Sequence, residues 1–248
     1  MYDLAVIVPV RRGSSRIVDK SMLPFGGYNS LIEWKLSQLV KVIDPWRIYL
    51  SSEDEEFLAL ARKYGASTHR RPLRLATGHI ASFSEVITGI VSDIHHEHIA
   101  WCTVVCPLMS PQEYVDTFQR YHDDVIHGDH DSLVGVNLMK EYFWEKEGAL
   151  NYQADRNHTI SQNLPDWYKV TNSVYMCPKA DIMTQGYFLG ERPVLQPLSK
   201  ISGIDIDYIE DYRMARALYG IYEEDGLDQV RPETQLSWPQ PLRMAVGS

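Results

Sequence analysis

Residues 5–21 read AVIVPVRRGSSRIVDKS, and they join an apolar run to a short basic segment. The apolar run, residues 5–10, predicts a buried strand. In an open α/β sheet, ligands bind at the carboxyl ends of the strands, which is where the basic segment would lie. Its guanidinium and ammonium groups and its glycine backbone suit a nucleoside triphosphate. The spacing differs from G-x-x-x-x-G-K-[ST], which excludes an ordinary P-loop.

Further along the chain, strand patterns alternate with helical ones. The sequence predicts strands over residues 4–10, 46–51, 99–106 and 132–139. Helices are predicted to begin at N-caps or capping boxes at Ser30, Ser52, Ser82 and Ser110, each followed by an amphipathic run. This alternation is typical of an α/β fold with a doubly wound, mostly parallel sheet.

The alternation stops after Lys140. Residues 141–203 are rich in Tyr, Trp, Asn, Gln and Pro, with a strand-like stretch at 173–177, which indicates an insertion that covers the site or pairs two subunits. A helical pattern returns over residues 208–219. We therefore expect a single domain over residues 1–222 that contains this insertion, followed by a loose C-terminal arm over residues 223–248.

The composition excludes several classes of protein. The 248 residues carry a net charge of −9, which argues against a nucleic-acid surface. There is no apolar run of the ~18 residues that a membrane span needs, and the acidic N-terminus is unlike a signal peptide. Three cysteines, none in a C-x-x-C pair, suggest buried thiols in a reducing compartment. We expect a cytoplasmic protein that binds neither nucleic acid nor membrane.

A second informative string is GIDID at residues 203–207. Asp205 and Asp207 are two residues apart, so on an extended segment their carboxylates lie on the same side. Together they could share a hard cation such as Mg²⁺ with phosphate oxygens. A D-x-D pair alone is weak evidence, because paired acids are also common at solvated strand ends.

The basic segment resembles the signature IPARGGSKGIPKKN of the cytidylyltransferases that activate nine-carbon sugar acids, the CMP-N-acylneuraminate (sialic acid) synthetase family. The chain keeps Ile7, Pro9, Arg11, Gly13, Ser14, Ile17 and Lys20 of that pattern, and it departs from it at Arg12, Ser15, Arg16, Asp19 and Ser21. The extra Arg12 and Arg16 either strengthen triphosphate binding or fill the space left by the missing residues.

Other segments resemble the same family in the same order along the chain. They are residues 51–54, 71–82, 104–111, 162–165, 171–175 and the D-x-D pair at 205–207. Within them, Thr77 and Gly78 stand where an acid is usual, and Cys106 stands where a glutamine usually meets the sugar. The matches extend from Tyr2 to about Tyr219.

The resemblance implies a role for each matching residue. Contacts to the nucleotide would come from Pro9, Arg11, Gly13, Ser14, Lys20, Arg71 and Ser82. Contacts to the acceptor would come from Cys106, Gln162, Asn172, Tyr175 and Phe188. Asp205 and Asp207 would bind Mg²⁺, and Arg11, Lys20 and Asp207 would be catalytic. Two of these have simpler readings, since Ser82 is also an N-cap and Arg71 could anchor its own loop.

The activity implied is the Mg²⁺-dependent reaction of CTP with a 2-keto-3-deoxy sugar acid, such as sialic, legionaminic or pseudaminic acid. It would yield a CMP-sugar and pyrophosphate. The fold implied is a Rossmann-like nucleotidyltransferase, a homodimer whose insertion serves as lid or dimerisation element. Two alternatives stay open: a cytidylyltransferase for Kdo or another small acid such as a phosphonate, and a non-catalytic nucleotide-binding relative.

Overall fold

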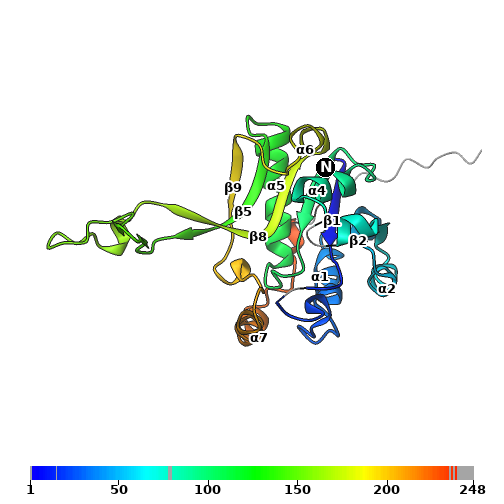
Figure 1. The fold of residues 1–248 in the computed structure, drawn as a ribbon, viewed down its shortest axis with the longest axis horizontal. Coiled ribbons are helices and arrows are strands. Elements are labelled where there is room, and N and C mark those ends of the chain that lie inside the picture. The colour runs from blue at the N-terminus through cyan, green and yellow to red at the C-terminus, as the bar shows by residue number, and fades with distance from the viewer. Residues whose placement is uncertain (1, 15, 78–79, 235, 237, 239–248) are drawn as a thin grey trace, which may run out of the picture.

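The computed structural model describes residues 2–14, 16–77, 80–234, 236 and 238, and its body is built on a seven-stranded sheet (Figure 1). The sheet has the order β3-β2-β1-β4-β8-β5-β9, and β8 runs antiparallel to its neighbours while the other pairs are parallel. The strands are β1 (Leu4–Pro9), β2 (Ile48–Ser52), β3 (Ser67–Arg70), β4 (His98–Cys102), β5 (Ser132–Met139), β8 (Trp167–Pro178) and β9 (Pro193–Pro197). The predicted α/β fold with a mostly parallel, doubly wound sheet is confirmed.

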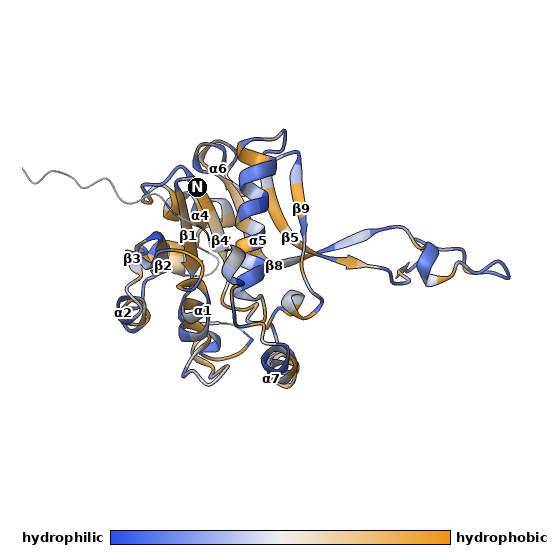
Figure 2. Cartoon of the chain, turned by 180° about the vertical axis from the view of Figure 1, so that it is seen from behind, coloured by the Kyte–Doolittle hydropathy of each residue, from blue (hydrophilic) through white to orange (hydrophobic). Residues whose placement is uncertain are grey.

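Helices cover both faces of this sheet. They are α1 (Leu31–Leu39), α2 (Glu55–Lys63), α3 (Leu73–Ala76), α4 (Phe83–Val91), α5 (Pro111–Tyr121), α6 (Lys179–Gln185) and α7 (Ile209–Glu224). Side chains of β1 alternate between two cores: Val6 and Val8 pack with α1, α2, α5 and α7, whereas Ala5 and Ile7 pack with α4 and α6. Figure 2 shows this apolar colouring concentrated in the strands of the body. None of the described helices has the length and apolar character needed to cross a bilayer.

Local signals placed most helix starts correctly. Ser30, Ser82 and Ser110 each accept a hydrogen bond from the backbone N–H three residues on, as the sequence predicts. The start of α2 differs. Asp54 is its N-cap, because the Asp54 carboxylate accepts from the Glu56 N–H while the Ser52 hydroxyl accepts from the Asp54 N–H. Strand β4 also ends at Cys102, four residues before the predicted end.

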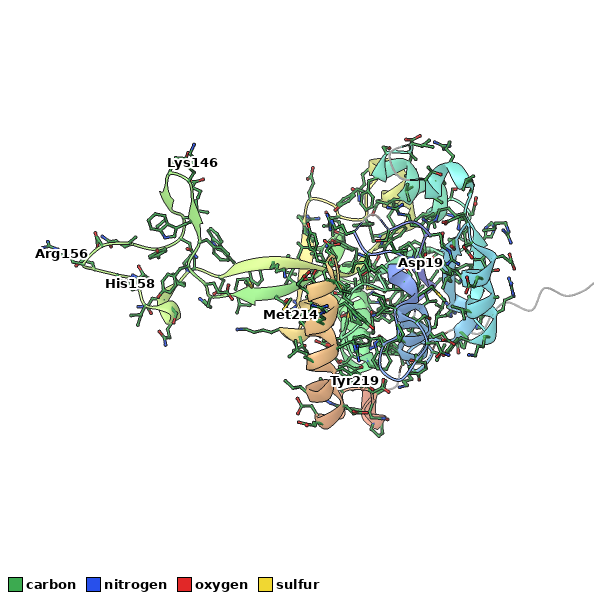
Figure 3. All side chains as sticks on the ribbon, turned by 60° about the horizontal axis from the view of Figure 1, so that its bottom comes forward. Asp19, Lys146, Arg156, His158, Met214 and Tyr219 are labelled. Atoms are coloured by element: carbon green, nitrogen blue, oxygen red, sulfur yellow. The ribbon has the colours of Figure 1, made fainter. Side chains whose placement is uncertain are left out.

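A long arm leaves the body between β5 and β8 (Figure 1). The two strands stay paired as far as Met139 and Trp167, and residues 140–166 continue outward. The arm contains the short strands β6 (Trp144–Glu145) and β7 (Gly148–Ala149), and its labelled residues Arg156 and His158 lie far from the body (Figure 3). Strand β8 then returns to the centre of the sheet, because Val174 and Met176 are apolar and fully buried. The projecting segment is therefore shorter than residues 141–203.

Helix α7 runs to Glu224, across the predicted boundary at residue 222. Beyond it, the described residues are tied to the body. Lys41 and Asp228 form an ion pair of 2.5 Å, and the Trp238 indole N–H donates to the Val42 carbonyl at 3.1 Å. The described part of the expected C-terminal arm therefore bonds to the segment after α1, and the Thr234 hydroxyl bonds Gln112 of α5 at 3.0 Å. Residues 239–248 lie outside the described residues.

Lys35 of α1 is fully buried beneath the turn that follows β4. Its ammonium group donates to the Cys106 carbonyl at 3.0 Å and to the Tyr114 hydroxyl at 2.7 Å. Burial lowers the pKa of Lys35 to about 8 from its ordinary value of 10.5. Lys35 therefore links α1 and α5 to the turn that follows the carboxyl end of β4.

This depressed pKa makes stability depend on pH in a defined direction. Between about pH 8 and 10.5 the unfolded chain keeps a proton that folded Lys35 has released, so the folded state gains stability as pH rises. Relative to Lys35→Met, we expect the wild-type chain to gain up to about 3 kcal/mol between pH 7.5 and 10.5. Urea unfolding of both proteins at the two pH values measures this. A difference in unfolding free energy that does not change with pH would refute it.

Candidate active site

A cleft lies at the carboxyl ends of β1 and β4, where two adjoining cavities of about 650 and 360 Å³ meet. Both are lined by Pro9, Arg11, Arg16, Thr103, Val105 and Asp207. The larger cavity adds the predicted residues Arg71, Asn172, Tyr175, Phe188 and Asp205, and the smaller adds Ser14, Lys20 and Ser21. The fold thus brings residues from five separate predicted segments to one cleft.

The carboxylate pair faces the basic segment across this cleft. The Ile206 N–H donates to the Val105 carbonyl at 2.9 Å, which fixes the segment between the two aspartates beside the end of β4. Asp207 forms ion pairs with Arg16 at 2.5 Å and with Lys20 at 3.4 Å. Burial raises the pKa of Asp207, but the hydrogen bond from Arg16 and the nearby Lys20 outweigh burial and hold that pKa below its usual value.

Asp205 is the less satisfied of the two. Its Oδ2 accepts from the Asn172 side-chain amide at 2.9 Å, whereas its Oδ1 is buried with no hydrogen-bond partner. Burial raises the pKa of Asp205, and the neighbouring Asp207 adds to the effect of burial. A buried carboxylate oxygen without a partner costs free energy unless a cation or donor reaches it. The residues therefore fit a hard cation.

Two carboxylates do not complete the coordination of a metal ion. Among the residues that the structure describes, no three His, Cys, Asp or Glu side chains are placed to hold a metal together. Mg²⁺ commonly keeps one or two protein carboxylates and takes its other ligands from phosphate and water. The two carboxylates of Asp205 and Asp207 match this coordination preference of Mg²⁺.

The two extra arginines of the basic segment point to different places. Arg12 turns away from the cleft: its Nε contacts Asp54 at 2.7 Å, and its guanidinium stacks on the Phe57 ring at 4.4 Å. Arg16 lines both cavities and lies over the Tyr208 ring at 5.1 Å. Arg12 therefore anchors the segment to α2, while Arg16 presents its charge to the cleft.

Arg71 forms part of the cleft wall and also holds the basic segment in place. Its buried guanidinium donates to the carbonyls of Val10 at 3.1 Å and Ser51 at 2.6 Å. Burial lowers the pKa of Arg71 to about 10, so the group stays charged at neutral pH. The sequence left open whether Arg71 anchors a loop or contacts the nucleotide. These bonds show that it anchors the chain at Val10 and Ser51.

Four of the predicted residues do not line the cleft. Cys106, a predicted acceptor contact, is fully buried, and its thiol donates to the Thr171 carbonyl at 3.0 Å. Its backbone carbonyl accepts from the buried Lys35, and its side chain lies toward β8. The Ser82 hydroxyl accepts a hydrogen bond from the Glu85 N–H and so caps α4. Gly13 is exposed and has a φ of 78°. Gln162 lies on the arm. Ser15, Gly78 and His79 lie outside the described residues.

Sequence reasoning predicted Tyr175 and Phe188 at the site but missed the other rings of an aromatic wall in the larger cavity. Trp101, Tyr175 and Tyr187 surround Phe188, with ring centroids 5.7, 4.2 and 4.5 Å from it, and Phe83 completes the wall. Trp101 could have been found, because it and Thr103 are two residues apart at the end of β4 and so share a side. Tyr187 and Phe83 come from loop and helix ends, where no such pattern applies.

Gly203 precedes the carboxylate pair and has no room for a side chain. An added Cβ would lie 1.6 Å from Asn137 Oδ1. Asn137 cannot easily move, since it is buried and its amide donates to the Leu198 carbonyl at 3.0 Å and the Ser199 carbonyl at 2.8 Å. Gly203→Ala should destabilise the fold by about 2–3 kcal/mol and displace Asp205.

Urea unfolding and turnover measure the effect of Gly203→Ala. The matched control is Gly220→Ala on α7, where an added Cβ meets nothing within 4 Å. In a helix this control should be neutral or stabilising by about 0.5–1 kcal/mol. Equal effects of the two substitutions would show that the contact with Asn137 is unimportant.

The fold and the cleft define the class of protein. A mostly parallel α/β sheet, with a basic segment after β1 and a carboxylate pair facing it at the carboxyl ends of the strands, is a nucleotidyltransferase fold. The model of the cytidylyltransferase family matches residues 5–160, and the chain belongs to this family.

Curated relatives and solved structures agree with this assignment. The pseudaminic acid cytidylyltransferase of Campylobacter jejuni serotype O:2 is 23% identical over 233 residues, covering 89% of this chain and 97% of the relative. The fold is similar to a CMP:2-keto-3-deoxy-manno-octonic acid synthetase solved with CTP, with a TM-score of 0.61, 13% identity, and coverage of 88% and 99%. It is also similar to the 4-diphosphocytidyl-2C-methyl-D-erythritol synthase of Anaerococcus prevotii, with a TM-score of 0.62, 12% identity, and coverage of 88% and 96%.

Proposed function

We propose that this protein forms a CMP-sugar from CTP and a 2-keto-3-deoxy sugar acid of the sialic, legionaminic or pseudaminic type, with release of pyrophosphate. The observation that carries the proposal is that Asp205 and Asp207 line the same cleft as Arg11, Arg16 and Lys20, while Oδ1 of Asp205 is buried without a partner. Family membership supports the use of CTP. The relatives named for pseudaminic acid support a nine-carbon sugar acid as acceptor.

The cations of the basic segment would bind the triphosphate. Arg11 and Lys20 come from either end of the segment, and the Lys20 ammonium is held at the site by the Ile206 carbonyl at 2.6 Å. Transfer of a phosphoryl-type group depends mainly on positioning and on neutralising charge, so these groups would orient the α-phosphorus toward the acceptor and stabilise the departing pyrophosphate.

Asp205 and Asp207 would hold the magnesium ion. When bound there, Mg²⁺ would supply positive charge to the triphosphate oxygens and lower the pKa of the attacking anomeric hydroxyl. Arg16 and Lys20 now balance the charge of Asp207, so we propose that Arg16 exchanges this carboxylate for a phosphate when the metal nucleotide enters.

The aromatic wall would receive the acceptor. Tyr187 and Phe188 present apolar ring faces next to the polar Asn172 and Thr103, a mixture that suits a sugar acid with apolar acyl or methyl substituents. Asn172 stands at the junction of the wall and the carboxylate pair, with a φ of 56° that asparagine tolerates better than most residues. Its amide would fix the acceptor beside Asp205.

The arm would pair two copies of the chain. It exposes large apolar side chains, including Trp144 at 62% and Ile160 at 55% exposure, which a monomer would leave in water. We propose a homodimer in which the arm carries Gln162 toward the partner's cleft. Because CTP is a cytoplasmic nucleotide, we propose the cytoplasm as the compartment.

Tyr175 would act as a positioning residue. Its hydroxyl donates to Asn172 Oδ1 at 2.5 Å, and the Asn172 amide in turn donates to Asp205. Loss of a hydrogen bond made directly to a metal ligand typically costs about 10–100-fold in metal affinity, and Tyr175 acts one bond further out, through Asn172. Tyr175→Phe should therefore raise the Mg²⁺ concentration for half-maximal activity by up to about tenfold. Tyr187→Phe, in the same wall, is the control. A Mg²⁺ requirement that Tyr175→Phe leaves unchanged would exclude this chain of bonds.

Pyrophosphate release across a panel tests the reaction and the acceptor together. The panel would contain sialic, legionaminic and pseudaminic acids, Kdo and simple phosphonates, each with CTP and Mg²⁺ and each without one of the two. Release with one nine-carbon acid, dependent on both CTP and metal, supports the proposal. Release with Kdo or a phosphonate alone would move the assignment to that acceptor. Calorimetric binding of CTP with no release from any acceptor would favour a non-catalytic relative.

A further inference from the structure

A pair of histidines lies near the amino end of β1, whereas the cleft lies at its carboxyl end. His122 follows α5, and its ring stacks on that of Tyr2, just before β1 begins. The Nε2 atoms of His122 and His127 are 3.2 Å apart. The ten residues from 122 to 131, HDDVIHGDHD, include seven His or Asp, a composition that favours metal binding.

The backbone brings these two imidazoles together by an uncommon turn. Residues His122–Ile126 form a π-helical turn, in which the His127 N–H donates to the His122 carbonyl at 3.2 Å. This bond spans five residues, and it places the side chains of His122 and His127 on one side. In an α-helix the same spacing would separate them. Single π-turns inside helices are rare and are frequently found at functional sites.

A neighbouring carboxylate prepares His122 to act as a ligand. Asp123 Oδ1 lies 2.9 Å from His122 Nδ1, so this nitrogen carries the proton and donates it to the carboxylate. The Nε2 atom of His122 then carries the lone pair, which accepts the hydrogen bond from His127 Nε2 and would bind a metal ion in place of that proton. Metal-binding histidines characteristically hold their other ring nitrogen in this way. His127 is exposed and can rotate its ring or change its tautomer to match.

We propose that His122 and His127 form a two-histidine site for a borderline transition metal ion, of which Zn²⁺, Ni²⁺ and Cu²⁺ are examples. Two nitrogens that bind one tetrahedral ion at about 2.0–2.1 Å lie about 3.3–3.4 Å apart, close to the separation of 3.2 Å observed here. Water reaches the exposed His127 and would complete the shell. Imidazole ligands favour these ions over Mg²⁺, so the site is separate from the carboxylate pair in its chemistry as well as its place.

Isothermal titration with ZnCl₂ tests the site in the full-length chain. Saturating Mg²⁺ is present throughout so that the cleft carboxylates are already occupied. The variants are His122→Ala, His127→Gln and, as a control, His130→Ala. His130 is in the same segment but outside the pair. His127→Gln keeps a polar side chain at an exposed position, so it also serves if His122→Ala loses its stacking on Tyr2 and fails to fold.

We expect one Zn²⁺ per chain in the wild type and in His130→Ala. Loss of either member of the pair should weaken this binding by at least about tenfold, because the second imidazole binds within the same molecule. Zn²⁺ should also raise the melting temperature of the wild type and not that of His127→Gln. The proposal is overturned if the wild type takes up no Zn²⁺, or if His127→Gln binds it as tightly as the wild type does.

Discussion

Asp205→Asn and Asp207→Asn should each lower turnover by about 10²–10³-fold while CTP still binds. The substitutions keep the size of each side chain and remove the charge that would hold Mg²⁺. The effect should be larger at Asp205, because its Oδ1 has no other partner and is buried, whereas Asp207 is already balanced by Arg16 and Lys20. Steady-state rates with CTP, Mg²⁺ and the acceptor found in the panel measure this, with CTP binding followed by calorimetry.

Glu210→Gln is the matched control for these two substitutions. Glu210 is an exposed acid in the first turn of α7, a few residues beyond the pair, and it lines neither cavity of the cleft. It should leave turnover within about twofold, as surface substitutions usually do. If Asp205→Asn kept wild-type turnover at the same Mg²⁺ concentration, the metal assignment would be wrong.

Arg16→Ala and Arg12→Ala should distinguish triphosphate binding from a structural role, which the sequence alone could not do. Arg16 lines both cavities, so its loss should raise the KM for CTP by about 10–100-fold, the value of a charge-assisted hydrogen bond to phosphate. Arg12 contacts Asp54, Glu56 and Phe57, so its loss should lower the melting temperature and change the KM by no more than about twofold.

Arg16→Lys provides a second test of the same idea. A lysine keeps the charge and loses the paired N–H donors, so we expect a KM for CTP between those of the wild type and Arg16→Ala. A nucleotide affinity that Arg12→Ala and Arg16→Ala reduce equally would show that both arginines act through the shape of the basic segment and not through contact with phosphate.

Much of the fold could be predicted because its signals are local. The apolar run of β1 and the caps at Ser30, Ser82 and Ser110 depend on neighbouring residues, and the structure has all of them. The place of β8 in the sheet could not be predicted, because its pairing with β4 and β5 depends on contacts between distant segments. Because this pairing could not be predicted, residues 141–203 were expected to form one insertion, although β8 and β9 within them belong to the main sheet.

The site shows the same division between local and distant signals. Asp205, Asp207, Arg11 and Lys20 fall in motifs whose spacing carries their chemistry, and they meet in the cleft. Cys106 lies outside the cleft lining, which the motif could not indicate because it gives the position of the residue in the chain but not the direction of its side chain. The direction is seen only in the folded chain, where the thiol bonds the Thr171 carbonyl, 65 residues away. The different positions of the Arg12 and Arg16 side chains likewise depend on acids 40 or more residues away, since Arg12 pairs with Asp54 and Arg16 with Asp207.

The most direct test of the account is to identify the product by mass spectrometry after incubation with CTP, Mg²⁺ and pseudaminic, legionaminic or sialic acid. The account predicts a CMP ester of one of these acids, formed in equal amount with pyrophosphate by the wild type and nearly absent with Asp205→Asn. A cleft that binds CTP and Mg²⁺ but yields only CMP or CDP, with no ester of any nine-carbon acid, would contradict it.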